Sequence, residues 1–484
     1  MARLSPLVEH LLRRAGFGAS TAERAEYEGL SYQAVVDKLL TFDALDYSID
    51  NFIGTPGYVG ITTRGQFQPN TVIVDARQRW LFRMVHAPNP LQEKMALFWH
   101  HHFATGFTKI QAAFETADAT RMMAASPYND PGSARGQIEL FRQQGLGSFR
   151  DLLQEIAKDP AMLVWLDGKD NTKTKPQENF GRELMELFTF GVENYVETDV
   201  YAAARVFTGW NLTTVRGGTP QAYYAFNYRS TQHDSGEKAF SFPIFDNGDH
   251  VIPPRSATAG IQDGIDLIDA LARHPETAKR LARRLWVWFV SEVEPPDEGF
   301  VSNIANVYTQ SNTDIRSVIR AVLMSPQFTD SRYFFHRYAW PAEFVVRLLK
   351  EVGFLGFSVD SALTPMVAMG QVLFDPPDVN GWELGPGWFS TAGMLSRMNF
   401  ASDLAKNQRI ALREAARPYR VMPSTLVAFA LDRMSVPNLA PEVVNSLVDY
   451  IRAGGTWTGS DSQLLNRAGG LFHLLGGSGV YQFV

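Results

Sequence analysis

The chain has 484 residues, and its 45 basic and 51 acidic side chains give a formal net charge of −6. This balance argues against a dedicated nucleic-acid binder, which needs a positive surface to neutralise phosphates. The chain has no cysteine, which excludes disulfides, zinc thiolates, iron–sulfur clusters and cysteine nucleophiles.

An apolar fraction of 45% and a charged fraction of 20% are typical of a globular chain with a core. No apolar run approaches the roughly 18 residues that a membrane helix needs, so we expect a soluble protein without a membrane span. The N-terminal residues lack the apolar segment of a signal peptide. The chain as written is therefore predicted to be cytoplasmic, and the alternative is an exported protein whose leader has been removed.

Helical periodicity runs through most of the chain. Apolar residues recur at three- and four-residue spacing in segments 5–15, 31–43, 72–86, 91–104, 147–158, 176–190, 199–208, 261–273, 276–290, 313–324, 339–351, 390–405, 425–434 and 440–453. Residues 212–246 instead combine aromatic and β-branched residues with turn sequences, which predicts a β-hairpin or a three-stranded sheet. The predicted fold is mainly α: a large multi-helix globular body with a small β insertion around 212–246.

The domain organisation has two interpretations. The chain shows no internal repeat and no linker long enough to separate domains, so residues 1–484 are predicted to form a single unit. The alternative is a subdivision into an N-terminal helical part (1–210), a β insertion (211–260) and a C-terminal helical part (261–484).

Three consecutive histidines follow Trp99. Neutral imidazole is a common metal ligand, so His100 and His102 are candidate ligands for a divalent transition metal. On a continuing α-helix, residues i and i+2 lie about 200° apart and cannot share one ion. In an extended segment they face the same way. If the helix continues, the alternative is that His102 caps an apolar stripe of the core.

A second motif lies on the predicted helix 176–190, where Asn179, Arg182, Glu183 and Glu186 fall on one narrow stripe between bulky apolar residues. Glu183 and Glu186 are candidate catalytic residues, either as two ligands of one metal or as a general acid and base. We predict that the stripe faces inward. We also predict that Arg182, or another basic group such as Arg14, hydrogen-bonds to one of the glutamates, because buried carboxylates one turn apart repel. The alternative is a solvated helix face.

His233 and Asp234 form a third motif, which is an orienting dyad, a metal site or an Asx-turn. Gly-Trp turns place Trp210 and Trp382 at sharp bends, where the rings either stack on a sugar or pack in the core. We further predict that His100 or His102, the two glutamates and the His233–Asp234 turn converge on one cleft, because unpaired buried polar groups are costly.

These pieces, in this order, resemble the bacterial family labelled "domain of unknown function 1800". The matching segments are His10–Gly18, Lys94–Phe103, Glu178–Gly191, Asp199-Val200, Phe207–Trp210, His233–Lys238, His274–Ala278, and Met369-Gly-Gln followed by Pro376–Trp382. The resemblance covers nearly the whole chain and implies a mostly helical fold. It also implies a sulfatase-like partner protein, and it implies that many members of the family are exported. In similar proteins the position of Phe188 can be His and the middle histidine of the triplet varies. The family has no settled activity.

Three functions remain open from the sequence. The first is a hydrolase of a glycan or other polymer, metal-dependent or carboxylate-driven, with Glu183, Glu186, His233 and Asp234 as catalytic residues. The second is a non-catalytic module that binds a glycan or a partner protein through Asn179, Arg182, Trp210, Asp378 and Trp382. The third is a structural protein whose polar motifs form a fully paired buried network.

Overall fold

The computed structural model describes residues 4–42, 46–436, 439–453 and 455–484, and within them the protein is mainly α-helical. The α-helices of the N-terminal half are α1 (Pro6–Arg14), α2 (Thr21–Tyr27), α3 (Tyr32–Leu40), α4 (Ile73–His86), α5 (Pro90–His102), α6 (Phe107–Ala113), α7 (Thr116–Ala124), α8 (Gln137–Gln144), α9 (Phe149–Ala157), α10 (Pro160–Trp165), α11 (Asn179–Glu183) and α12 (Glu197–Val206).

The α-helices after the strands are α13 (Ile261–Arg273), α14 (Pro275–Leu285), α15 (Glu298–Gln310), α16 (Ile315–Leu323), α17 (Pro326–Thr329), α18 (Pro341–Val352), α19 (Asp360–Ala368), α20 (Thr391–Asn407), α21 (Arg409–Ala416), α22 (Pro423–Arg433), α23 (Pro441–Arg452) and α24 (Asp461–Gly476). None of the described helices combines the length and the apolar character that crossing a bilayer requires.

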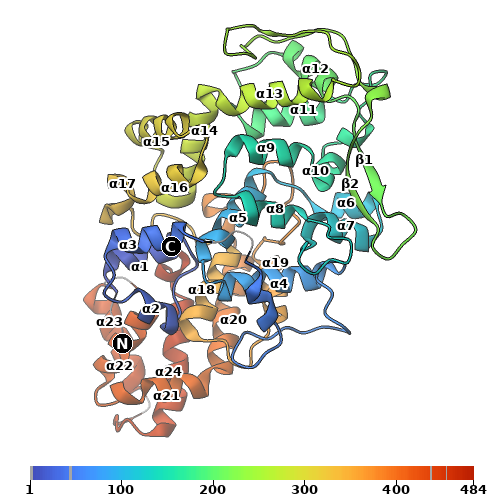
Figure 1. Ribbon diagram of the computed structural model, residues 1–484. Helices are drawn as coiled ribbons and strands as arrows, with labels where there is room; N and C mark the ends of the chain where they lie inside the picture. The colour runs from blue at the N-terminus through green and yellow to red at the C-terminus, as the bar shows by residue number, and fades with distance from the viewer. Residues whose placement is uncertain (1–3, 43–45, 437–438, 454) are drawn as a thin grey trace.

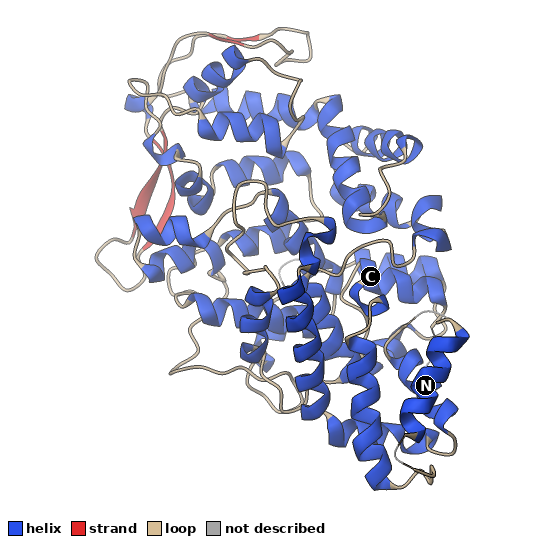
Figure 2. Ribbon diagram, turned by 180° about the vertical axis from the view of Figure 1, so that it is seen from behind, coloured by secondary structure: helices blue, strands red, loops and turns tan. Residues whose placement is uncertain are grey.

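The strands form two small antiparallel sheets. Strand β1 (Trp210–Val215) pairs with β2 (Tyr223–Tyr228), and β3 (Lys238–Ala239) pairs with β4 (Val251–Ile252). Figure 2 shows both as short ribbons at the edge of the helical body. The predicted mainly α fold with a β insertion is confirmed, although the insertion begins two residues earlier and extends beyond residue 246.

Two central helices organise the core. Every residue of α5 and of α18 is buried, and Figure 1 shows both in the middle of the molecule, between α11–α13 at one end and α21–α24 at the other. Proline in the first turn suits each helix start, because its missing N–H is not needed there. The ion pair of Lys94 with Glu343 joins the two helices. Such contacts link distant parts of the chain, but whether the chain forms a single unit stays a prediction.

Two of the predicted helices end differently from the expectation. The segment 176–190 forms the short helix α11 and then a π-helical turn, Leu184–Phe188. Likewise, α14 passes into a π-helical turn, Trp286–Val290. Apolar periodicity does not distinguish an α turn from a π turn, because the extra residue shifts the helix face only locally. Such turns are frequent at functional sites, and both of these line the cavities described next.

Candidate functional site

Three segments lie around the histidines at the C-terminal end of α5. The first is α11 with the π-helical turn that follows it, the second is α14 with its own π-helical turn, and the third is the loop 376–384. The histidine triplet and the stripe of α11 were expected from the sequence to carry chemistry. His101 and His102 of the triplet, and Asn179 and Glu183 of the stripe, line adjoining surface cavities, which together form the candidate site.

The loop 376–384 is fixed to α5 by a very close approach. The backbone N–H of Trp382 donates to Nδ1 of His101 over 3.1 Å. Gly381 has a φ of +91°, and a Cβ there would lie 2.3 Å from His101 Nδ1, so only glycine fits this position. An Asx-type turn shapes the loop, because Asp378 Oδ1 accepts from the N–H of Asn380 over 2.7 Å.

The first cavity contains the carboxylates and has a volume of about 350 Å³. We call it the carboxylate cavity. Its lining includes Lys109, Trp165, Asn179, Glu183, Asp378 and Val379. The candidate catalytic residue Glu183 and the candidate binding residues Asn179 and Asp378 therefore lie around one opening.

Glu183 is the carboxylate of this cavity with the most unusual surroundings. Burial, and then the neighbouring carboxylate of Glu186, raise the pKa of Glu183 above its usual value, and the charge of Arg182 offsets only part of this rise. Among the described residues, Glu183 has neither a hydrogen-bond donor nor a cation as a direct partner. Glu186, in contrast, accepts a hydrogen bond from the hydroxyl of Tyr195. Glu183 is thus a free, half-buried carboxyl that faces a cavity.

A chain of polar contacts links further residues at the carboxylate cavity. Asp167 accepts from Nδ2 of Asn179 over 2.9 Å and pairs with Lys109 over 3.1 Å. Lys109 also lies 5.6 Å from the ring centroid of Trp165, in a cation–π contact. The sequence analysis missed Lys109 and Trp165, because neither belongs to a motif and only the tertiary structure brings them to the loop.

The second cavity is basic. Two overlapping hollows, of about 320 Å³ and 210 Å³, share His101, Arg280, Arg284 and Leu384, and we call them together the basic cavity. Its lining also includes His102 of α5, Leu187 of the π-helical turn after α11, and Asn380 and Trp382 of the loop. Val379 lines both the carboxylate and the basic cavity, so the two adjoin. The arginines were also missed, although their four-residue spacing on α14 is visible in the sequence.

The histidine triplet stays helical, since α5 continues through His102. His100 packs edge-on against Trp80 and Trp382, and burial lowers its pKa to about 3. Nε2 of His102 lies 3.1 Å from the carbonyl oxygen of Phe188 in the π-helical turn. The extended geometry in which His100 and His102 share an ion is therefore not adopted.

No group of three or more His, Asp or Glu side chains within the described residues is arranged as a metal site. The role of His100 and His102 as metal ligands stays a prediction. His102 does meet the segment of the glutamates, so two of the three motifs predicted to converge lie together.

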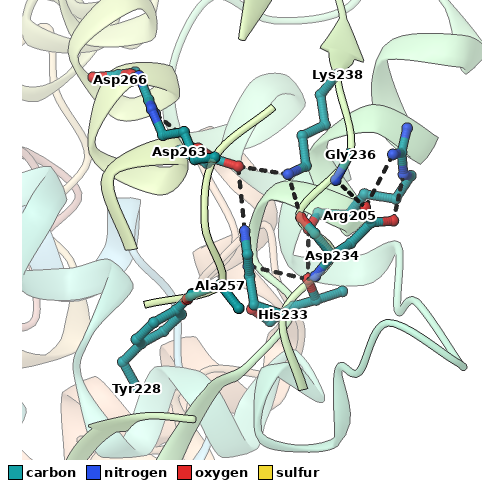
Figure 3. A network of polar contacts seen from close by, with 11 residues as sticks. Arg205, Tyr228, His233, Asp234, Gly236, Lys238, Ala257, Asp263 and Asp266 are labelled. Atoms are coloured by element: carbon teal, nitrogen blue, oxygen red, sulfur yellow. Dashed lines mark hydrogen bonds and ion pairs between the residues drawn. The ribbon is translucent and has the colours of Figure 1, made fainter. Parts of the chain in front are cut away.

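The third motif lies in a polar network of its own, which Figure 3 shows. The ring of His233 contacts the carbonyl of Thr208 over 2.9 Å and the carboxylate of Asp263 over 3.2 Å. Asp234 pairs with Arg205 over 2.7 Å, and the hydrogen bonds from Arg205 lower the pKa of Asp234 to about 2. Neither His233 nor Asp234 lines the carboxylate or the basic cavity. Their partners are those of a paired structural network.

Trp210 and Arg182, which were also predicted as binding residues, both have contacts within the protein. Trp210 is buried against Phe207 and Phe226, as a packing residue is. Arg182 pairs with Glu197 over 2.5 Å and with Glu178 over 3.4 Å.

The predicted ion pair to the glutamates is therefore wrong for Arg182. Arg14 donates instead to the carbonyl of Tyr333. In the described part of the chain neither Glu183 nor Glu186 has a basic partner within salt-bridge distance. Asn179 is exposed, and Arg182, Glu183 and Glu186 are half-buried, so the stripe faces the surface rather than the core, and its members Asn179 and Glu183 line the carboxylate cavity.

The fold and the site define a large, mainly α-helical protein in which the histidine triplet and the helix of the glutamates lie where the buried helix α5 ends at the surface. The chain belongs to the family described as "Protein of unknown function (DUF1800)", whose model matches residues 10–483. No curated protein and no solved structure matches the chain. The resemblance stated from the sequence motifs is thus confirmed over nearly the full length.

Proposed function

We propose that the protein is a carboxylate-driven hydrolase that cleaves a glycan in the carboxylate cavity. The observation that carries this proposal is the position of Glu183, a free half-buried carboxyl with a raised pKa, in the same cavity as the exposed carboxyl of Asp378. Most glycoside hydrolases use a pair of carboxyl groups whose surroundings keep one protonated and the other ionised.

The two carboxyl groups would have different roles. A general acid must hold its proton near neutral pH, and burial beside Glu186 favours the protonated form of Glu183. Glu183 would then protonate the oxygen of the leaving group. Asp378 lies exposed on a loop and suits the ionised role, in which a carboxylate activates water or stabilises the positive charge that develops on the sugar ring.

The remaining walls of the cavity suit a sugar. Trp165 offers part of an aromatic face, and rings of this kind pack against the apolar face of a pyranose. Asn179 and Lys109 supply hydrogen-bond donors for hydroxyl groups. In this proposal Glu186 acts through the pKa of Glu183, while His233 and Asp234 support the fold.

The test is hydrolysis of a panel of neutral and acidic polysaccharides, followed by the release of reducing ends. The wild-type protein is expected to cleave at least one of them, with activity that falls as the pH rises through the raised pKa of Glu183. Glu183→Gln and Asp378→Asn should each lower kcat by about 100-fold or more, the usual scale for a lost acid or base.

Glu178→Gln is the matched control, because Glu178 is an exposed glutamate just before α11 whose carboxylate pairs with Arg182 outside the cavity. It should keep the wild-type rate. Full activity in Glu183→Gln, or no hydrolysis of any polysaccharide by the wild type, would refute the proposal.

A further inference from the structure

We propose that the basic cavity binds an oxyanion, namely a sulfate, phosphate or carboxylate group, carried by an acidic sugar. This goes beyond the hydrolase proposal, since binding at the basic cavity does not require catalysis next to it. Only the position of the anion beside a cleaved bond rests on the proposed function. The inference follows from the charges, the hydrogen-bond donors and the location of this cavity.

The cavity contains two cations that are not neutralised by ion pairs. Arg280 and Arg284 lie one turn apart on α14, both half-buried and both in the lining of the two overlapping hollows. Like charges at this spacing destabilise a helix, and partial burial adds a desolvation cost. Within the described residues neither has a carboxylate within salt-bridge distance. Their neighbour Arg283, in contrast, pairs with Glu298 over 3.1 Å.

The hydrogen-bond donors of Arg280 are also largely unused. One nitrogen, Nη2, makes a long contact of 3.4 Å with the carbonyl oxygen of Leu187, and Nε is buried without a partner among the described residues. Burial lowers the pKa of Arg280, and the carboxylate of Glu186, which is hydrogen-bonded to Tyr195, offsets only part of this effect. The charge of Arg284 is opposed by its surroundings. Burial, and then the like charge of Arg280, lower the pKa of Arg284 to about 10.

His101 adds a third donor. Its Nδ1 accepts from the backbone N–H of Trp382, so the proton of the neutral ring resides on Nε2. Burial, followed by the charge of Arg284, lowers the pKa of His101 well below its usual value and keeps the ring neutral. The lining of the cavity thus combines two guanidinium groups with an imidazole ring, a set that supplies both positive charge and hydrogen-bond donors.

This set matches an oxyanion in both charge and shape. Guanidinium groups bind carboxylate, sulfate and phosphate oxygens in a forked geometry that an ammonium group does not reproduce. A bound anion would neutralise the repulsion between Arg280 and Arg284. Because Val379 lines both cavities, an anion held here is next to the sugar-sized carboxylate cavity. An acidic sugar residue therefore fits better than an isolated ion.

The direct test is isothermal titration calorimetry of the full chain at an ionic strength fixed with sodium chloride. The probes are sodium sulfate, inorganic phosphate, glucuronate, and a sulfated disaccharide together with its unsulfated counterpart. Saturable binding of at least one anionic probe, and tighter binding of the sulfated disaccharide than of its unsulfated counterpart, is the expected result. Tighter binding of an anionic sugar than of the inorganic ions would identify the sugar as the source, and equal binding would identify the free ion; either supports an oxyanion site.

The variants assign the binding to the arginines. Arg284→Gln should weaken anion binding at least 10-fold, and Arg284→Lys should lose part of the affinity because it keeps the charge but not the fork. Lys279→Gln is the matched control: it removes one positive charge from the same helix, at an exposed position where Lys279 pairs with Glu276. It should bind like the wild type.

Stability measurements separate a binding role from a structural one. Without an anion, the Tm of Arg284→Gln should equal or exceed that of the wild type, because the substitution removes a half-buried charge that has no acidic partner. Sulfate should raise the Tm of the wild type and leave that of Arg284→Gln unchanged. The proposal is overturned if no anionic probe binds saturably, or if Arg284→Gln binds as the wild type does. Both results are independent of whether any glycan is hydrolysed.

Discussion

The substitution Gly381→Ala tests the contact that builds both cavities. A Cβ at this position would lie 2.3 Å from Nδ1 and 2.6 Å from the carbonyl oxygen of His101. The backbone oxygen belongs to a fully buried helix and cannot move aside. The loop 376–384 must therefore shift away from α5, and the hydrogen bond from Trp382 to His101 must lengthen or break.

The expected cost has two parts. Holding an alanine at a φ of +91° costs about 1–2 kcal/mol. Loss of the buried hydrogen bond between Trp382 and His101 adds about 1–2 kcal/mol, because both partners are left without a substitute. The free energy of unfolding should therefore fall by roughly 2–4 kcal/mol.

Urea unfolding followed by tryptophan fluorescence measures this change, and Gly356→Ala is the matched control. Gly356 also has a positive φ, +71°, but a Cβ there would meet no atom within 4 Å. Gly356→Ala should show only the backbone cost of about 1–2 kcal/mol, and it should leave anion binding unchanged. If the two variants are equally stable, or if Gly381→Ala keeps full anion affinity, the reasoning about the loop contact is wrong.

Two further predictions concern buried charges away from the cavities. Glu343→Gln breaks ion pairs with Lys94 and Arg337 and should cost roughly 3–5 kcal/mol in urea unfolding. Burial alone would raise the pKa of Glu343, but the two cations outweigh it and lower the pKa from 4.5 to about 2. The stability that this depressed pKa contributes is present above pH 4.5 and lost as the pH falls to 2, so the wild type should lose more stability over that range than the variant; equal pH profiles would contradict this. Asp263→Asn should cost a similar amount, roughly 3–5 kcal/mol, because it leaves the buried Lys238 without its carboxylate. Thermal unfolding should show this loss while glycan hydrolysis and anion binding at 25 °C persist, and loss of either activity in a folded variant would place the network of Figure 3 in the site.

Much of the helical architecture follows from local pattern. The segment 261–273 was predicted from apolar spacing alone and is α13, Ile261–Arg273, because one face of that helix packs into the core. Helices such as α7 and α8 were missed. They are short, and buried polar residues such as Gln137 and Glu139 interrupt their apolar pattern. These polar residues are satisfied by distant partners, which no local pattern reveals; Glu139, for example, pairs with Arg83 and Arg142.

The candidate site shows the same division. The sequence by itself determined that the histidine triplet, the glutamates of α11 and the segment ending at Trp382 carry polar groups in apolar surroundings, and such groups must be paired or placed at a surface. It also determined the family, through motifs in a fixed order.

Only the tertiary structure decided which of these groups meet. The contact of the C-terminal end of α5 with the π-helical turn Leu184–Phe188 brings His102 to Phe188, and the close approach that Gly381 permits places Asp378 in the same cavity as Glu183. Tertiary packing also brings Arg280 and Arg284 to the site from about 100 residues further along the chain, and it leaves His233 in a separate network. Contacts at such separations depend on the relative placement of whole helices, which side-chain periodicity along each helix does not encode.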